Sequence, residues 1–511
     1  MTFVAPEQFN LAEWLLDARV AEGRGDRIAL RLPERTLSFR EVQALSCRFA
    51  NVLAGLGVRP EERVFLALPD GAEWVGALFG ILRAGAVAVP VNPELSPAAI
   101  AALLDYLRPR LAVVEGGLVA TYAEGIARAA ERVPLLTVGA AAPGCPSFEE
   151  FSRTVADGFP TARTHRDDPA VMLFSGGTTG RPKAVVQPHR SYAFTTVAYG
   201  QGILGLGEDD VTLAVPKLYF GYALGSNLFF PFSVGASSCL FPEKATADSV
   251  FRAIARHRPT LLVNVPTMIQ HLVSHPQAAA QDLSSLRLAT TAGEALPPEL
   301  RARWGATFGV ELLDGLGTAE QWHVFLTQRP GRARAGTLGE PVPGFELRVC
   351  LPDGRELPDG EIGELWVRGG ARALGYFREH DRSQQTFRGE WVVTGDLVSR
   401  SADGVFTYHG RDDDVFKVAG RWFSPTEVED CLLRHPAVAE CAVVGQEDSS
   451  GLTKPHAVVV ARERRAGLER ELADFVAAEL APFKAPRSVR FVDALPRTHL
   501  GKVDRAALRR G

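Results

Sequence analysis

Two periods of hydrophobic positions alternate along the first half of the chain. Residues 63–68 form a short apolar run, residues 71–84 carry apolar side chains at helical spacing, and residues 86–91 are apolar again. Continuous apolar runs are typical of parallel strands buried on both faces, and an intervening helix makes a βαβ unit. Similar runs recur at residues 111–115, 261–265, 286–290 and 310–313. The pattern predicts an α/β fold whose large N-terminal body holds two βα sheets.

The pattern changes after about residue 340. Short alternating segments separated by turn residues occur at residues 346–349, 364–368, 391–394 and 405–408. These segments predict a small β-rich subdomain. The last hundred residues predict helices at 426–433 and 468–480 and strands at 438–444, 456–461 and 489–492. Because these elements have apolar faces of their own, they predict a separate α+β domain at the C-terminus.

Composition narrows the class of protein without indicating a chemistry. The 511 residues include 56 Lys and Arg against 60 Asp and Glu, a net charge of −4, with 46% hydrophobic residues. These values exclude global disorder and give no electrostatic reason to expect nucleic acid as a partner. No basic leader and no apolar run of membrane-spanning length is present. Six scattered cysteines without metal-binding spacing are typical of reduced thiols. We therefore expect a cytoplasmic protein with no membrane partner.

The strongest local signal is an apolar strand that runs directly into a glycine-rich loop. Residues 171–174 (VMLF) are followed by residues 175–183 (SGGTTGRPK). Glycines allow backbone N–H groups to converge on anionic oxygens, hydroxyls add donors, and the lysine adds charge. Pro182 separates Arg181 from Lys183, so the loop is not of the P-loop NTPase type, in which GK is followed by Ser or Thr. The segment predicts a polyphosphate site.

This loop resembles the signature loop of the adenylate-forming superfamily, which contains acyl- and aryl-coenzyme A ligases, carrier-loading adenylation domains and luciferases. Six further segments resemble motifs of that superfamily, in the same order: residues 291–296 (TAGEAL), 314–320 (DGLGTAE), 336–341 (GTLGEP), 391–396 (WVVTGD), 408–417 (YHGRDDDVFK) and 495–502 (LPRTHLGK). The resemblance covers essentially the whole chain. It implies an N-terminal domain of residues 1–411 and a mobile C-terminal domain of residues 412–511.

The resemblance implies a reaction in two halves. A carboxylate attacks the α-phosphate of ATP and gives an acyl-adenylate and pyrophosphate. A thiol then attacks the adenylate and gives a thioester and AMP. The implied cofactors are ATP, Mg²⁺ and coenzyme A. Glu320, a hard oxygen ligand, is implied as the metal ligand.

The resemblance assigns nucleotide-binding roles to several motif residues. Asp396 would accept hydrogen bonds from the ribose hydroxyls, and Arg411 would donate to ribose or phosphate. By pattern alone, the charged run at 411–414 is more typical of a solvated turn. The full nucleotide-binding set is Ser175, Gly176, Gly177, Thr178, Thr179, Gly180, Lys183, Gly293, Glu294, Ala295, Asp314, Gly315, Asp396, Arg411 and Gly420. Thr318 and Glu320 complete the reacting-phosphate side.

The C-terminal motifs imply domain alternation. Lys502 would stabilise charge on the α-phosphate and the substrate carboxylate during adenylation. Asp413 matches the hinge position, where large changes of backbone torsion are absorbed. Lys417 and Gly420 would lie on the face that the rotated domain presents to the thiol.

Three positions depart from the superfamily pattern. Ala319 stands where a threonine usually bonds the α-phosphate, Ala184 replaces the glycine after the loop lysine, and Ala419 replaces a frequent glycine or serine. None removes a charged group, but Ala319 removes a hydrogen-bond donor.

An aromatic-rich run suggests the acid. Residues 217–236 (KLYFGYALGSNLFFPFSVGA) resemble the benzoate- and hydroxybenzoate-coenzyme A ligase branch, although by pattern alone such a run is more often core than pocket. Gln321 and Trp322 fill positions that are usually aliphatic in that branch, which leaves room for an amino- or hydroxybenzoate. His323 could instead be a hydrogen-bonded core histidine. The resemblance places the ring near Gly221, Tyr222, Gly317, His323 and Val324.

Three functions stay open at this point. The first is an aryl-coenzyme A ligase acting on a small aromatic acid, as a monomer or homodimer. The second is a stand-alone adenylating enzyme that loads a carrier protein. The third is a non-catalytic nucleotide-binding protein, motivated by Ala319 and Ala184.

Overall fold

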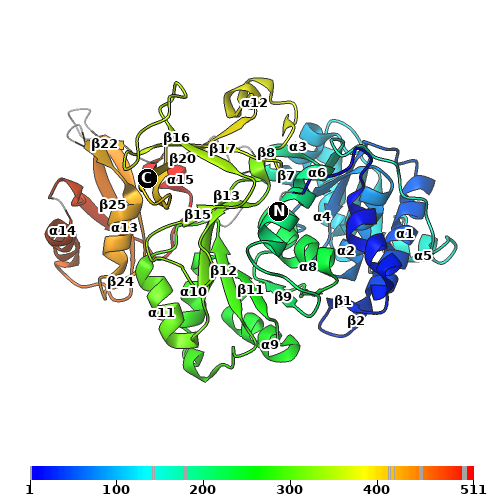
Figure 1. Ribbon diagram of the computed structural model, residues 1–511, viewed down its shortest axis with the longest axis horizontal. Coiled ribbons are helices and arrows are strands. Elements are labelled where there is room, and N and C mark those ends of the chain that lie inside the picture. Colours follow the sequence, from blue (N-terminus) through cyan, green and yellow to red (C-terminus); the bar gives the residue numbers. More distant parts are fainter. Residues whose placement is uncertain are drawn as a thin grey trace.

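A computed structural model describes residues 3–140, 142, 144–175, 182–412, 414, 416–418, 421–447, 453–480, 482–497 and 503–510. Figure 1 shows a large body, coloured blue to yellow, with the smaller orange and red C-terminal part at one end of it. This mixed α/β architecture confirms the fold class predicted from the sequence.

The first large sheet has seven strands in the order β18-β8-β7-β4-β3-β5-β6. Their bounds are β3 (Arg63–Ala67), β4 (Val87–Pro90), β5 (Leu111–Glu115), β6 (Leu135–Val138), β7 (Pro169–Ser175), β8 (Lys183–Pro188) and β18 (Gly375–Tyr376). The central strands are parallel, and β8 and β18 run antiparallel at one edge. Strands β3 and β4 with the helix between them, α2 (Ala72–Arg83), confirm the predicted βαβ unit.

The second large sheet has nine strands in the order β15-β14-β13-β12-β11-β9-β10-β1-β2. Their bounds are β1 (Ile28–Arg31), β2 (Thr36–Ser38), β9 (Val211–Ala214), β10 (Ser237–Cys239), β11 (Leu261–Asn264), β12 (Leu288–Ala292), β13 (Leu312–Gly317), β14 (Val324–Thr327) and β15 (Glu340–Pro341). Strands β1 and β9 to β13 are parallel, and the others pair antiparallel at the edges.

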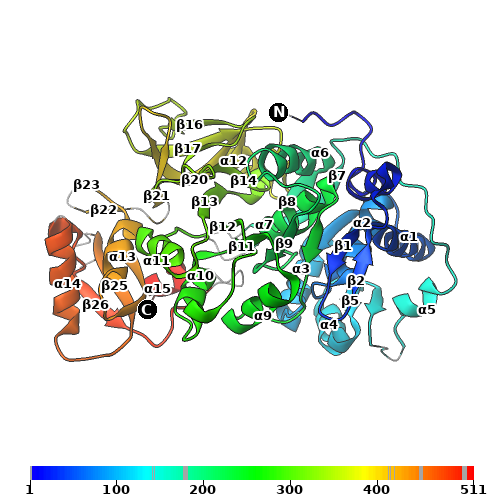
Figure 2. The same cartoon turned by 60° about the horizontal axis from the view of Figure 1, so that its bottom comes forward.

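Smaller sheets complete the chain, and Figure 2 shows the β16–β20 sheet on one side of the body. It contains β16 (Glu346–Cys350), β17 (Gly363–Arg368), β19 (Phe387–Arg388), β20 (Trp391–Arg400) and β21 (Phe406–Arg411). The C-terminal part contains the hairpin β22 (Phe416–Val418) and β23 (Arg421–Phe423), and the sheet of β24 (Val438–Glu447), β25 (Thr453–Ala461) and β26 (Ser488–Phe491). A β-rich sheet in the body and a smaller α+β part at the C-terminus agree with the predicted fold class.

Helices cover the sheets. Besides α2, the α-helices are α1 (Phe39–Gly55), α3 (Pro97–Leu107), α4 (Val119–Arg128), α5 (Phe148–Ser152), α6 (His189–Thr195), α7 (Gly221–Leu224), α8 (Phe230–Val234), α9 (Ala247–His257), α10 (Pro266–Val273), α11 (Pro298–Phe308), α12 (His380–Thr386), α13 (Pro425–Leu433), α14 (Leu468–Glu479) and α15 (Arg505–Arg510). Helices α1 and α2 pack closely at Gly80, where a Cβ would come within 2.9 Å of the Ser46 carbonyl oxygen.

Asp70 joins the loop after β3 to the loop after β9, and so links the two large sheets. Its carboxylate accepts a hydrogen bond from the Leu218 N–H at 3.0 Å, next to Lys217. The Lys217 ammonium donates to the Phe241 carbonyl at 2.7 Å. Burial raises the pKa of Asp70 from 3.8 to about 6, and the charge of Lys217 and the Leu218 N–H oppose this shift.

The shifted pKa of Asp70 predicts a pH-dependent stability. The folded state binds this proton more tightly than the unfolded chain, so the resulting stabilisation is complete below pH 3.8 and is lost as the pH rises through about 6. A rise of the pKa from 3.8 to about 6 corresponds to a change on the order of 3 kcal/mol in the free energy of unfolding. We expect the melting temperature of the native protein to fall relative to that of Asp70→Asn between about pH 4 and pH 7. Calorimetry of both proteins checks this, and a difference that does not change with pH would contradict it.

Two further observations concern membrane-spanning helices and the cysteine side chains. Across the described ranges, no helix is both long enough and apolar enough to span a bilayer. All six cysteines are free thiols, as their scattered positions predict.

Candidate active site

The hairpin of β7 and β8 carries the predicted phosphate loop. Strand β7 ends at Ser175 and β8 begins at Lys183, and these two residues pair across the hairpin. The local pattern explains this geometry, since an apolar strand enters the glycine-rich turn and another leaves it. Gly176, Gly177, Thr178, Thr179 and Gly180 lie outside the described residues.

The neighbouring strands β12 and β13 carry the predicted adenine-side residues. Gly293, Glu294 and Ala295 follow β12 directly, and Asp314 and Gly315 lie within β13, the neighbouring parallel strand. The carboxyl ends of parallel strands meet at one edge of a sheet, where ligands of open α/β sheets bind. The Glu294 carboxylate is held by the Thr267 hydroxyl at 2.8 Å, a contact that the sequence analysis missed.

Asp314 is an unusual carboxyl group. Burial raises its pKa from 3.8 to about 8, against the opposing effects of the Gly315 N–H and Arg301. A carboxyl group with this pKa is mostly protonated at neutral pH. Asp314 can therefore donate a hydrogen bond as well as accept one.

Glu320 lies on η7 (Ala319–Gln321), a short 3₁₀ helix directly after β13. Thr318 caps this helix, with its hydroxyl accepting from the Gln321 N–H at 3.4 Å. The Ala319 carbonyl accepts from the Gln187 side-chain amide at 2.6 Å, and the Ala319 side chain packs against the apolar cluster around Tyr376. The departure at Ala319 therefore fits an apolar environment.

Lys183 and Glu320 both contact Tyr376, which the sequence analysis did not single out. The Tyr376 hydroxyl donates to Glu320 Oε1 at 2.7 Å. The Lys183 ammonium lies 5.1 Å from the centre of the Tyr376 ring. Burial lowers the pKa of Lys183, and the negative charge of Glu320 opposes this. The structure thus brings together the cation and the carboxylate that the sequence predicted for the phosphate side.

The segment that carries Tyr376 is fixed by main-chain contacts. The Ala373 N–H donates to the Glu320 carbonyl at 2.9 Å, and the Phe377 N–H donates to the Ala184 carbonyl at 2.8 Å. Ala184 is fully buried in β8, so its methyl group fills space in the core.

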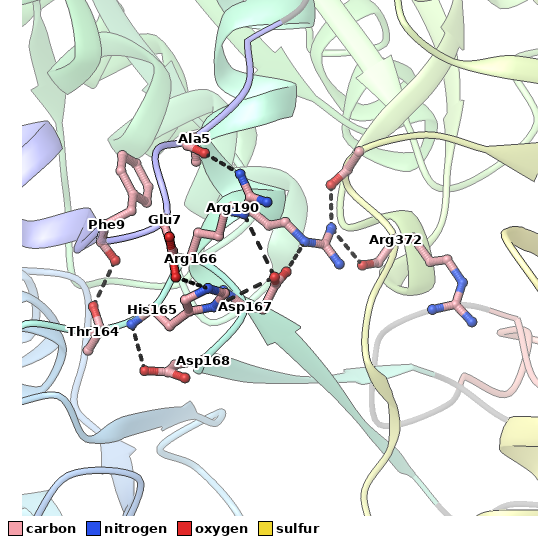
Figure 3. Close-up of polar contacts among 11 residues, drawn as sticks. Ala5, Glu7, Phe9, Thr164, His165, Arg166, Asp167, Asp168, Arg190 and Arg372 are labelled. Carbon is pink, nitrogen blue, oxygen red and sulfur yellow. Dashed lines mark hydrogen bonds and ion pairs between the residues drawn. The ribbon is translucent and has the colours of Figure 1, made fainter.

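Figure 3 shows Arg190 between Asp167 and the segment that precedes Tyr376. The Arg190 guanidinium donates to the Asp167 carboxylate and, at 2.6 Å, to the Gly370 carbonyl. Since Asp167 precedes β7 and Arg190 follows β8, the ion pair closes the base of the hairpin, and the hydrogen bond to Gly370 ties this base to the segment that precedes Tyr376.

A strained turn follows Glu320. The His323 N–H donates to the Gln321 carbonyl at 2.8 Å, and the central residue Trp322 has φ 59° and ψ −49°. This is the rarer type of γ-turn, which is strained for a residue with a side chain. The Trp322 ring is 2% exposed and packs edge-on against Tyr192 at 4.4 Å between ring centres. Aromatic packing thus holds a turn that separates Glu320 from His323.

His323 is 3% exposed and neutral. Its Nε2 lies 3.1 Å from both the Ser226 hydroxyl and the Tyr222 carbonyl. Burial lowers its pKa to about 3. Its Nδ1 has no hydrogen-bond partner among the described residues. The alternative prediction, a hydrogen-bonded core histidine, therefore fits Nε2 but does not fit Nδ1.

Two predicted neighbours confine His323. A Cβ on Gly317 would come within 2.4 Å of the His323 carbonyl oxygen, and Val324 pairs with Gly317 across β13 and β14. Gly225 is equally restricted, because a Cβ there would lie 2.5 Å from the His323 ring.

The aromatic run divides between core and site. Leu224 and residues 227–230 are buried, as expected for core, whereas Gly221 and Tyr222 at the start of α7 are half-buried. The Tyr222 hydroxyl donates to the Thr290 hydroxyl at 2.8 Å. A Cβ on Gly221 would meet Leu173 at 3.0 Å, so the backbone passes close to β7.

The predicted ribose pair forms on adjacent strands. Asp396 of β20 pairs with Arg411 of β21, and the Arg411 guanidinium lies 3.3 Å from the Asp396 carboxylate. Arg411 also donates to the Thr394 carbonyl at 2.7 Å. Asp396 is 4% exposed, and the Tyr408 hydroxyl lies 3.5 Å away. Arg411 is thus part of a strand rather than of a solvated turn.

The C-terminal site residues are described only in part. Asp413, Ala419, Gly420 and Lys502 lie outside the described residues, and of Lys417 only the backbone is described, in β22 opposite Trp422. The neighbouring Asp414 forms ion pairs with Arg509 at 2.6 Å and Arg505 at 3.5 Å. The segment next to the predicted hinge is therefore tied to α15.

A surface cavity of about 820 Å³ lies elsewhere, between residues 8–47 and 157–164 and beside Arg83. The Arg83 guanidinium forms an ion pair there with the Asp17 carboxylate at 2.6 Å. None of the predicted site residues lines this cavity.

Comparisons with known proteins agree with these motifs. The AMP-binding enzyme model matches residues 17–377, and the AMP-binding enzyme C-terminal domain model matches residues 427–502. The 4-hydroxybenzoate–CoA/benzoate–CoA ligase of Rhodopseudomonas palustris is 39% identical over 506 residues, covering 98% of this chain and 94% of that protein.

Two solved structures are similar over nearly their whole length. The anthranilate CoA ligase AuaEII in complex with anthranoyl-AMP has a TM-score of 0.94 and 38% identity, covering 99% of this chain and 98% of that one. A benzoate CoA ligase from Burkholderia xenovorans LB400 has a TM-score of 0.90 and 38% identity, covering 98% and 100%. The chain therefore belongs to the family of AMP-binding enzymes, the adenylate-forming superfamily that its motifs predict.

Proposed function

We propose that this protein is an AMP-forming aryl-coenzyme A ligase that activates benzoate or a small amino- or hydroxybenzoate. The proposal rests on the short segment of chain that joins Glu320, a charged group, to His323, which lies among aromatic rings. Glu320 contacts Tyr376 beside Lys183, and His323, three residues later, lies among aromatic rings. The proposed phosphate site and the proposed aromatic acid site would thus lie close together in space, as transfer of an adenylyl group to a carboxylate requires.

Lys183 and Ser175, with the loop between them, would bind the β- and γ-phosphates. Asp314 would contact adenine with Gly293, Glu294, Ala295 and Gly315, and Asp396 and Arg411 would hold the ribose. Across the described ranges no cluster of three or more metal-ligating side chains occurs. A single carboxylate, Glu320, fits Mg²⁺, which usually takes one or two carboxylates together with substrate phosphates. Bound there, Mg²⁺ would neutralise phosphate charge.

His323 and its neighbours would bind the acid. A flat ring needs apolar walls and a few polar groups for orientation. The ring of His323 packs against Phe230 at 4.7 Å and Tyr222 at 5.3 Å between centres. Gly221 and Gly317 would lie at the floor of the acid site, where the backbone is closely packed, with Val324 beside the ring.

The C-terminal domain, residues 412–511, would alternate between two orientations about Asp413 relative to residues 1–411. In the first, Lys502 would approach the α-phosphate and the carboxylate, with Thr318 close by. In the second, Lys417 and Gly420 would face the thiol. The three similar proteins described above are named CoA ligases, which favours coenzyme A over a carrier-protein thiol as the acceptor.

A panel of acids tests the proposal. The protein is incubated with ATP, Mg²⁺, coenzyme A and one of benzoate, 2-aminobenzoate, the hydroxybenzoates or alkyl acids, and thioesters are identified by mass spectrometry. We expect aryl thioesters with equimolar AMP and pyrophosphate. Formation of alkyl thioesters alone would contradict the proposed acid site, and adenylate without thioester would point to a carrier protein.

A further inference from the structure

Lys183 and Glu320 carry opposite charges close together, yet within the described part of the chain no ion pair joins them. The field of Glu320 nevertheless acts on Lys183, since it opposes the lowering of the lysine pKa by burial. Tyr376 contacts both groups: its ring faces the Lys183 ammonium at 5.1 Å and its hydroxyl donates to Glu320 Oε1 at 2.7 Å. A direct ion pair would neutralise both groups before a substrate is bound.

Tyr376 is held firmly enough to separate two charges. It lies in β18, paired with Val185 of β8, and its N–H donates to the Ser383 hydroxyl at 2.9 Å. Its ring is 8% exposed and packs against Phe387 at 5.3 Å between centres. The preceding segment is anchored by Arg190 through the Gly370 carbonyl. The tyrosine thus cannot move aside without disturbing the sheet edge.

The Tyr376 hydroxyl donates to Glu320 Oε1 at 2.7 Å. A phenol donates one hydrogen bond, which fixes one carboxylate oxygen of Glu320 and leaves the other available. The ring face attracts the ammonium of Lys183 without neutralising its charge.

We propose that Tyr376 is a positioning residue that keeps Lys183 and Glu320 apart and orients the Glu320 carboxylate toward a divalent cation. Its ring preserves the positive charge for the nucleotide, and its hydroxyl orients the acidic ligand. This inference rests on the proposed nucleotide site but not on the identity of the acid or the thiol.

Two substitutions separate the two roles. Mn²⁺ binding is titrated by electron paramagnetic resonance in the presence of an ATP analogue with a methylene bridge between the α- and β-phosphates, without acid or coenzyme A. We expect Tyr376→Phe to weaken Mn²⁺ binding about ten-fold, because a hydrogen bond to a charged group is lost. Binding of the analogue in EDTA should not change, because the ring remains under Lys183.

Tyr376→Leu removes the ring as well and allows Lys183 to pair with Glu320. We expect it to weaken metal-free analogue binding about ten-fold, since an ion pair must be broken first. Adding Glu320→Gln should then restore that binding, by a larger factor than Glu320→Gln produces in the native protein. An equal factor in both backgrounds would contradict the separating role.

Tyr106→Phe is the matched control. The Tyr106 hydroxyl donates to the Phe377 carbonyl at 2.7 Å and so contacts the same segment without contacting Lys183 or Glu320. The Tyr106→Phe variant should lose thermal stability but bind Mn²⁺ as tightly as the native protein. Equal loss of Mn²⁺ binding in Tyr106→Phe and Tyr376→Phe would reduce Tyr376 to a structural role. If the native protein binds neither Mn²⁺ nor the analogue, the proposed nucleotide site fails instead.

Discussion

Replacing Lys502 by alanine should abolish adenylation and leave thioester formation intact. The resemblance assigns this lysine to the α-phosphate and the carboxylate, which it would approach only in the domain orientation of the first half-reaction. Loss of a group that stabilises developing charge lowers rates by about 10²–10³-fold or more. We expect pyrophosphate exchange to fall by at least this factor, while aryl-AMP supplied to the variant is still converted to the aryl thioester. Both half-reactions are measured separately, by isotope exchange and by thioester formation.

Lys484→Ala is the control for Lys502→Ala. Lys484 lies in the same C-terminal part and pairs with Glu427 at 2.5 Å. Exposed ion pairs of this kind contribute about 1 kcal/mol or less. This variant should keep both half-reactions. If Lys502→Ala slows both halves equally, the assignment of Lys502 to adenylation is wrong.

Gly317→Ala should disable the acid site through backbone crowding. The new methyl group would lie 2.4 Å from the His323 carbonyl oxygen and 2.8 Å from the Val324 nitrogen. Both are main-chain atoms, so no side-chain rotation relieves the contact. Overpacking of this kind destabilises by about 1–3 kcal/mol. Because His323 must shift, we expect the KM for the acid to rise about a hundred-fold or more, which a shift of about 1 Å can cause.

Gly305→Ala is the control for Gly317→Ala. No atom lies within 4 Å of a Cβ at this exposed position of α11. Alanine favours helix over glycine by about 1 kcal/mol. This variant should melt at the native temperature or above and keep the native KM. A native KM for Gly317→Ala would show that His323 does not contact the acid.

Elements with strong local patterns could be predicted from the sequence. Strand β3, helix α2 and helix α14 lie within one residue of the predicted bounds, because buried strands and amphipathic helices have distinct hydrophobic periods. The grouping of Lys183 with Glu320, and of Asp396 with Arg411, followed from motif resemblance, and the structure brings each pair together.

Residues that act through distant contacts could not be predicted. Tyr376 is 56 positions from Glu320, and no periodicity links the two. The γ-turn at Trp322 contradicts local preference, since a bulky residue avoids positive φ unless packing enforces it. The link through Asp70 joins loops that are 148 positions apart. Such features depend on the assembled sheets, and the sequence has no local signal for them.

The turn at Trp322 also restricts how this enzyme can be engineered. Only two residues separate Glu320 from His323, and one of them, Trp322, is held in a strained torsion by its buried ring. A substitution that moves His323 to admit a bulkier acid will therefore move Glu320 as well, because so short a segment cannot absorb the displacement. Transplanting the selectivity of another ligase should succeed only if β13, the turn and β14 are exchanged as one cassette. Changes to single pocket residues would lower the catalytic rate while they change the specificity.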